Sequence, residues 1–173
     1  MKLKNSQVVI TRKLPEIIEK RMSELFNVQL SQNKTPLKKD ELIKLCKDAP
    51  ILVPTIGDEL DEDFFQKINK KLKLIANYGA GFDHIDIRKA HKRRIIVTNT
   101  PDVLTNDTAD VTIALMLSVT RNLPKGIKII RENKWEGWSP TEILGNRILG
   151  KKLGILGMGR IVQAVAKKAI SFG

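Results

Sequence analysis

The stretch "LKLIANYGAGFDHIDIRKAHKRRIIVTN", from Leu72 to Asn99, contains the repeating unit that decides the fold. Its first apolar run predicts a strand, and a glycine-containing loop follows. Residues 85–94 then predict a helix, for which Asp83 or Asp86 is a suitable N-cap. A second apolar run, residues 95–99, predicts another strand. This order is typical of two neighbouring parallel strands joined by a helix that covers the sheet.

The same alternation extends back to the N-terminus. Apolar β-branched runs predict strands at residues 8–11, 28–30 and 51–55. Amphipathic runs predict helices at residues 15–26, 38–49 and 61–68. The expected buried faces of the first two helices comprise Ile17, Ile18, Met22, Leu25, Phe26, Leu42, Ile43, Leu45 and Cys46. Right-handed crossovers then favour an α/β fold with a flavodoxin-like, doubly wound parallel sheet, assigned to residues 1–99.

A different pattern begins near Thr98 and occupies residues 100–173. Pro101 interrupts the alternation, and a long helix is expected from Thr105 or Asn106 to Arg121. This helix is apolar around most of its circumference, so burial by a second domain or a second subunit is expected. A helix at residues 124–133, a strand at 152–156 and a final helix follow. These features predict the truncated start of a Rossmann nucleotide-binding domain.

Composition narrows the function classes. The 173 residues are 42% hydrophobic and 29% charged, values typical of a soluble globular protein. No signal peptide or membrane-spanning run is recognised, so a cytoplasmic location without membrane attachment is expected. A single cysteine excludes a disulfide framework. The net charge of +12 raises nucleic-acid binding as a minority alternative, but no aromatic residues interleave the densest basic cluster, residues 88–94.

Two glycine-containing segments are candidate binding sites. Gly79 and Gly81 would let the loop turn tightly and expose backbone N–H groups to an anion, whereas the alternative is a plain strand-to-helix turn. In "GILGMGRIV", Gly157 permits a tight turn and Gly159 lets a pyrophosphate approach a helix N-terminus. The third glycine of that fingerprint is replaced by Val162, which should push the helix away from the strand.

Other chemistry-bearing residues give weaker signals. The two histidines, His84 and His91, have no evident nucleophile and carboxylate beside them. Cys46 lies on an apolar helix face and is expected to be inert. Residues 61–63 are three acids that indicate a helix start. No metal-ligand spacing is present. A phosphoacceptor domain, which has a similar fold, would need acidic residues after the first strand and an aspartate at the end of the third, and the sequence has neither.

Four ordered motifs resemble one family: "LIANYGAGFDHIDI", "VTNTPDVLTNDTADVTIALML", "WEGWSP" and "KKLGILGMGRI". Together they resemble the D-isomer-specific 2-hydroxyacid dehydrogenases, most closely the glyoxylate/hydroxypyruvate reductase branch, from about Val8 to Gly173. The resemblance implies reduction of a small 2-oxo acid with NAD or NADP as cofactor. It also implies that the long apolar helix after Thr108 belongs to a homodimer interface.

The resemblance also assigns roles to individual residues. It implies that the backbone of Gly79, Ala80 and Gly81 binds the substrate carboxylate. It implies cofactor contacts at Thr108 and along the turn formed by Gly157, Gly159, Arg160, Ile161 and Val162. The family's catalytic arginine, glutamate and histidine lie downstream of this turn, so no catalytic residue is expected in residues 1–173. The isolated 173-residue chain is therefore expected to be inactive, and a non-catalytic remnant or dimerisation partner is the alternative interpretation.

Overall fold

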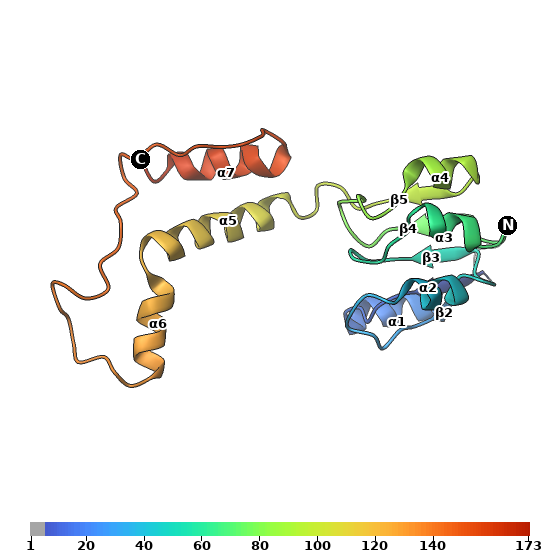
Figure 1. The fold of residues 1–173 in the computed structure, drawn as a ribbon, viewed down its shortest axis with the longest axis horizontal. Coiled ribbons are helices and arrows are strands. Elements are labelled where there is room, and N and C mark those ends of the chain that lie inside the picture. Colours follow the sequence, from blue (N-terminus) through green and yellow to red (C-terminus); the bar gives the residue numbers. More distant parts are fainter. Residues whose placement is uncertain (1–5) are drawn as a thin grey trace. The chain divides into compact units, whose positions relative to one another are not determined.

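The computed structural model describes residues 6–173, and the chain divides into two compact units, one ending at Pro101 and one running from Asp102 to Gly173 (Figure 1). The strands of the first unit are β1 (Gln7–Ile10), β2 (Asn27–Gln29), β3 (Ile51–Val53), β4 (Leu74–Ala76) and β5 (Ile96–Thr98). Its helices are α1 (Glu16–Leu25), α2 (Lys39–Leu45), α3 (Glu62–Lys67) and α4 (Ile87–Lys92). The strand order is β2-β1-β3-β4-β5 with every pairing parallel, which confirms the flavodoxin-like sheet.

Apolar side chains cover both faces of this sheet because successive strand residues point to opposite sides. On one face, Val9, Leu52 and Ile75 pack with Leu42 of α2 and Phe64 of α3. On the other face, a smaller cluster forms around α1. That cluster contains Val8, Ile10, Leu14, Ile51 and Val53, with Met22 and Phe26 packed against it. Burial on both faces explains why these strands are continuously apolar.

Helix α1 corrects one prediction of the sequence. Ile17, Ile18 and Leu25 were expected on its buried face, but they are exposed, Ile17 to 77%. Glu19 is buried instead, where its carboxylate accepts hydrogen bonds from the backbone N–H of Leu14 and from Lys13. The buried charge is acceptable there because both donors satisfy it.

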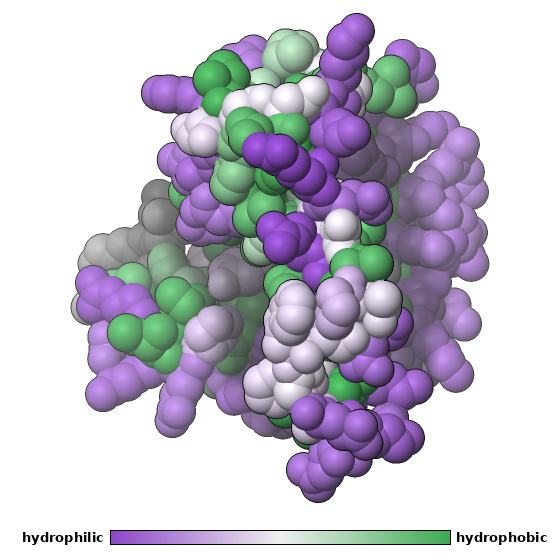
Figure 2. All heavy atoms as spheres, turned by 90° about the vertical axis from the view of Figure 1, so that its left-hand side faces the viewer, coloured by the Kyte–Doolittle hydropathy of each residue, from purple (hydrophilic) through white to green (hydrophobic). Residues whose placement is uncertain are grey.

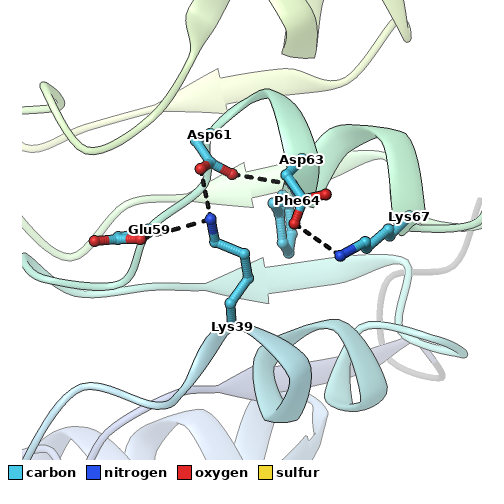
Figure 3. A network of polar contacts seen from close by, with 6 residues as sticks. All are labelled: Lys39, Glu59, Asp61, Asp63, Phe64 and Lys67. Atoms are coloured by element: carbon cyan, nitrogen blue, oxygen red, sulfur yellow. Dashed lines mark hydrogen bonds and ion pairs between the residues drawn. The ribbon is translucent and has the colours of Figure 1, made fainter.

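Helix α3 begins at a cluster of charged side chains (Figure 3). Asp61 is its N-cap and accepts a 3.0 Å hydrogen bond from the backbone N–H of Phe64. The ammonium of Lys39 lies 2.6 Å from the Asp61 carboxylate and 3.6 Å from that of Glu59. Lys39 and the Phe64 N–H hold the pKa of Asp61 below its usual value because they stabilise the ionised carboxylate. The predicted acidic start of this helix is confirmed.

The second unit contains α5 (Thr105–Thr120), α6 (Leu123–Arg131) and α7 (Arg160–Ile170). Helices α5 and α7 lie side by side, and two ion pairs join them or their flanks: Arg160 with Asp102 at 2.9 Å and Lys168 with Asp110 at 2.7 Å. Only Ala109 and Ile113 of α5 are fully buried. Asp102 and Asp110 are eight residues apart, and so are their partners Arg160 and Lys168, so the two helices run in the same direction.

The opposite side of α5 is uncovered in the described chain, so its expected burial by a second domain or a second subunit stays a prediction. Val111, Leu115 and Val119 follow a spacing of four and are 59%, 60% and 71% exposed. This spacing places them in one stripe along the helix. Figure 2 shows one face of the molecule, on which apolar residues lie uncovered between hydrophilic side chains.

Residues 152–156, predicted as a strand, do not form one. A strand needs a neighbour to satisfy its backbone N–H and C=O groups, and no strand of the described chain pairs with this segment. Its apolar residues are correspondingly open, with Leu156 fully exposed. The close packing of helix on strand that Val162 was expected to disturb is therefore not formed. Among the described residues, no helix has the length and hydropathy needed to cross a membrane.

Candidate functional site

The first candidate site is the loop that follows β4 at the carboxyl end of the parallel strands. In open parallel sheets of this kind, ligands bind at that edge. The backbone N–H of Asn77 donates to Thr98, and that of Tyr78 donates to Pro54, both at 2.9 Å. These bonds extend the pairing of β4 with β5 on one side and with the segment after β3 on the other. The start of the loop is therefore held on both sides.

Each carbonyl of Gly79, Ala80 and Gly81 accepts a hydrogen bond. The side-chain nitrogen of Asn77 donates to Gly79 at 3.2 Å and to Gly81 at 2.8 Å. The side-chain nitrogen of Asn99 donates to the Ala80 carbonyl at 2.7 Å. The backbone N–H of Thr100 provides a second bond to Gly79, at 3.0 Å.

The N–H groups of the same loop are free. Within residues 6–173, the backbone N–H groups of Ala80, Gly81 and Phe82 make no hydrogen bond. Gly81 and Phe82 are exposed and Ala80 is half-buried, so solvent or a ligand can reach this segment. A row of backbone N–H donors with its carbonyls already engaged suits a carboxylate.

The glycines of this loop act differently from the sequence prediction. Neither Gly79 nor Gly81 has a positive φ, so the turn does not depend on glycine's conformational freedom. A Cβ at Gly81 would meet nothing within 4 Å, whereas one at Gly79 would contact Ile56 at 3.4 Å. The missing side chain at Gly81 therefore leaves its backbone open to a ligand.

Behind the loop lie His84 and Asp58. The Nε2 of His84 is 3.1 Å from Oδ1 of Asn77, so His84 is tied to the loop as well. Partial burial lowers the pKa of His84, while the carboxylates of Asp58 and Asp83 oppose that shift. Asp58 is fully buried, and its Oδ2 accepts hydrogen bonds from Thr11 and Thr55. These bonds join the ends of β1 and β3 beside the site.

The second candidate site is the turn before α7. Gly157 has a φ of +87°, which confirms the predicted tight turn and favours glycine there. Gly159 is the N-cap of α7, and a Cβ added to it would meet nothing within 4 Å. The N–H groups of Arg160, Ile161 and Val162 belong to the first turn of the helix, where they lack intrahelical acceptors. No acidic residue lies in that turn, so it can receive an anion.

Thr108, the remaining predicted cofactor residue, lies on α5 and is exposed. Its carbonyl accepts a 2.8 Å hydrogen bond from the hydroxyl of Thr112. Arg160 is engaged with Asp102 through the 2.9 Å ion pair. Thus the predicted cofactor residues all lie in the second unit, while Gly79, Ala80 and Gly81 lie in the first.

Sequence reasoning missed the side chains that shape the first site. Asn77 and Asn99 were not singled out as site residues, although each donates to the glycine loop. The available signal was their position, since each is a polar residue directly after an apolar strand. Within residues 6–173 there is no group of three or more metal-ligating side chains. Cys46 is buried, and desolvation raises its thiol pKa to about 12, so it is not a nucleophile here.

Comparison with known proteins gives a consistent result. The family model described as "D-isomer specific 2-hydroxyacid dehydrogenase, catalytic domain" matches residues 8–171. A glyoxylate reductase of Pyrococcus horikoshii is 40% identical over 170 residues, which cover 96% of this chain and 51% of that protein. The chain therefore spans about half the length of the curated relatives that it matches.

Solved structures give the same picture. A protein of Thermus thermophilus has a TM-score of 0.88 and 42% identity, over 96% of this chain and 53% of its own. An NADPH-dependent glyoxylate/hydroxypyruvate reductase of Sinorhizobium meliloti, solved with NADP and malonate, has a TM-score of 0.79 and 29% identity. That match covers 97% of this chain and 51% of the other.

Proposed function

Because this chain belongs to the D-isomer-specific 2-hydroxyacid dehydrogenase family, we propose that its first unit binds the carboxylate of a small 2-oxo acid. The observation that carries the proposal is the loop of Gly79, Ala80 and Gly81, whose carbonyls are all engaged and whose following N–H groups are free. A carboxylate accepts charge-assisted hydrogen bonds from such donors. Glyoxylate and hydroxypyruvate are the substrates proposed, in agreement with the names of the relatives.

The second unit is proposed to contribute to binding NAD or NADP. The Gly157 turn and the open space at Gly159 fit a pyrophosphate, because a Cβ added at either glycine would meet nothing within 4 Å. Arg160, Ile161 and Val162 would present their backbone N–H groups there, and Thr108 remains a proposed cofactor contact. A bound nicotinamide cofactor supplies the hydride for reduction of the carbonyl carbon. This chain's own contribution is to hold the two ligands.

Reduction also requires a proton for the developing alkoxide. In the family that the motifs indicate, the arginine, glutamate and histidine of the reaction follow the Gly157–Val162 turn, and residues 1–173 do not include them. We expect a purified polypeptide of residues 1–173 to show no NADH- or NADPH-dependent reduction of glyoxylate or hydroxypyruvate. A steady rate proportional to the amount of polypeptide would contradict this expectation.

The exposed stripe of Val111, Leu115 and Val119 supports a further proposal, that α5 pairs with a second copy of the chain. Three apolar side chains at a four-residue spacing suit helix packing across an interface. Dimerisation applies equally to the alternative function, in which the chain is a non-catalytic partner. An acidic change in the stripe should then alter the oligomeric state without altering carboxylate binding.

Titration of ¹⁵N-labelled chain with oxamate, an unreactive 2-oxo-carboxylate analogue, tests the carboxylate site directly. The amide resonances of Ala80, Gly81 and Phe82 are expected to shift as they donate to the ligand. Sodium chloride at matched ionic strength is the control, because screening alone affects all exposed charges. Unchanged loop resonances at saturating oxamate, or equal shifts with chloride, would contradict the proposal.

A further inference from the structure

Asn77 is buried, with 3% of its surface exposed, although it is polar and lies directly after β4. Its amide nitrogen donates to the carbonyls of Gly79 and Gly81, two and four residues further on. Its Oδ1 therefore acts as the acceptor, and the Nε2 of His84 is the donor across the 3.1 Å contact. One side chain thus holds both ends of the glycine loop and uses both of its N–H donors and its carbonyl oxygen within the site.

Because of the geometry of the peptide bond, the hydrogen bonds to these carbonyls also determine where the N–H groups of the loop point. A trans peptide is planar, and its C=O and N–H point to opposite sides. The structure contains no cis peptide bond among the described residues. Holding the Gly79 carbonyl toward Asn77 therefore fixes the N–H of Ala80 on the other side, and holding the Gly81 carbonyl does the same for Phe82. Asn99 acts on the intervening peptide, because its bond to the Ala80 carbonyl fixes the N–H of Gly81.

Anchors are needed here because glycine-flanked peptides rotate easily. Gly79 and Gly81 have no side chains, so a peptide adjoining them can flip at small steric cost. A flip at the peptide between Gly79 and Ala80 would replace a donor by a carbonyl oxygen, which repels a carboxylate. The backbone N–H of Thr100 supports only the Gly79 carbonyl, which leaves Gly81 dependent on Asn77 alone among the described residues.

We propose that Asn77 is a positioning residue of the carboxylate loop: it sets the direction of the Ala80 and Phe82 N–H groups without touching the substrate. The inference rests on the proposed function, because the ligand is the 2-oxo-acid carboxylate. Asn99 has the same role for the single N–H of Gly81. The side-chain donors of Asn77 reach only the loop, and its backbone N–H keeps the sheet bond to Thr98. Its replacement should therefore alter the loop and leave the sheet intact.

The test compares Asn77→Asp and Asn77→Ala with the unchanged 173-residue chain. Asn77→Asp keeps the shape and the Oδ1 acceptor, but its ionised carboxylate has no donor and repels the two carbonyls. In both variants the carbonyl ¹³C resonances of Gly79 and Gly81 are expected to shift, while strand resonances stay in place. In Asn77→Ala, oxamate affinity should fall about tenfold or more, because two N–H groups lose their direction. Asn99→Ala should affect mainly the N–H of Gly81.

The matched control is Asn69→Ala, which removes a half-buried asparagine whose side chain accepts from the backbone N–H of Lys71 and donates to the carbonyl of Lys47, away from the loop. It should bind oxamate like the unchanged chain. Unaltered oxamate affinity and loop resonances in Asn77→Ala would overturn the positioning role, as would a loss of affinity accompanied by collapse of the strand resonances in both variants. If the unchanged chain fails to bind oxamate while Asn77→Asp still shifts the loop carbonyls, the positioning role stands and the proposed ligand is wrong.

Discussion

The two units of this chain contain similar sequence patterns but very different cores. In the first, a parallel sheet is covered on both faces, and Phe64, Leu52 and Ile75 are fully buried or nearly so. In the second, only Ala109 and Ile113 are buried, and many large apolar side chains are exposed. The difference shows that an apolar run acquires its structure from its neighbours, since burial of its surface supplies most of the stabilisation.

Two segments make this comparison concrete. Residues 74–76 and 152–156 are both apolar runs that precede a glycine-containing turn and a helix. The first forms β4, because β3 and β5 satisfy its backbone on both sides. The second has no strand beside it in the described chain and remains irregular. Whether an apolar run forms a strand here therefore depends more on a neighbouring strand to pair with than on its side-chain composition.

The largest expected effect concerns Cys46, which reports on the first unit. The thiol is fully buried and its pKa is raised to about 12, so labelling requires unfolding of this unit. Iodoacetamide at pH 8 should modify it about a thousandfold or more slowly than in concentrated urea. As a control, Ser171→Cys in a Cys46→Ala background places a thiol at an exposed site of the second unit and should react rapidly. Equal rates at the two sites would remove the contrast between the units.

Truncation of a core side chain comes next. Phe64→Ala should lower the free energy of unfolding of the first unit by about 3–5 kcal/mol, because it opens a cavity beside Phe65. The matched change in the second unit, Leu156→Ala, should cost less than about 1 kcal/mol, because Leu156 is fully exposed. Urea unfolding followed by circular dichroism measures both. Similar losses in the two variants would mean that the second unit has a core comparable to the first.

The stripe on α5 gives a third contrast. Leu115→Asp should weaken self-association about tenfold or more, because it places a charge within a proposed apolar interface. Sedimentation equilibrium measures the dissociation constant. Ile17→Asp, at an exposed apolar residue of α1, is the control and should leave association unchanged. A chain that is already monomeric at high concentration would refute the dimer proposal.

The smallest effect concerns the cap of α3. Asp61→Ala should destabilise the first unit by about 1 kcal/mol, and Asp61→Asn by less, because asparagine keeps an acceptor for the Phe64 N–H. The folded pKa of Asp61 is depressed, so its contribution is present above the unfolded pKa of about 3.9 and is lost as the pH falls through the folded pKa. Unfolding curves at pH 7 and pH 3 measure this difference. Asp63→Ala is the control, because it removes the exposed ion pair with Lys67 and should cost a few tenths of a kcal/mol at most. A loss of stability as large as that of Asp61→Ala would contradict the capping role of Asp61.

The sequence was sufficient for the parts governed by local periodicity. The five strands and four helices of the first unit and the buried Cys46 follow from patterns within one strand or helix, and the parallel order follows from their alternation. The sequence left Asp83 or Asp86 as the cap of α4, and the structure shows that it is Asp86. Glu19 could not be placed inside α1 by hydropathy, because its burial depends on donors from the preceding turn. The roles of Asn77 and Asn99 depend on the conformation of the loop. The Asn77 amide reaches a carbonyl four residues further on only when the loop folds back, and Asn99 reaches the carbonyl of Ala80, 19 residues earlier in the sequence.

The exposed side of α5 has a similar explanation. Hydropathy around Val111, Leu115 and Val119 predicts that the helix avoids water, but it does not identify which element covers it. In the described chain, α7 covers the opposite side only. The predicted strand at residues 152–156 differs from the structure for the same reason, since its pairing partner cannot be read from the segment itself.

A polypeptide that ends at Pro101 tests most directly whether the first unit folds by its own core and contains the carboxylate site. It should unfold cooperatively in urea, and its Ala80, Gly81 and Phe82 amides should respond to oxamate with a dissociation constant within about twofold of that of the 173-residue chain. A polypeptide that fails to fold, or that folds without binding oxamate while the 173-residue chain binds it, would contradict that claim.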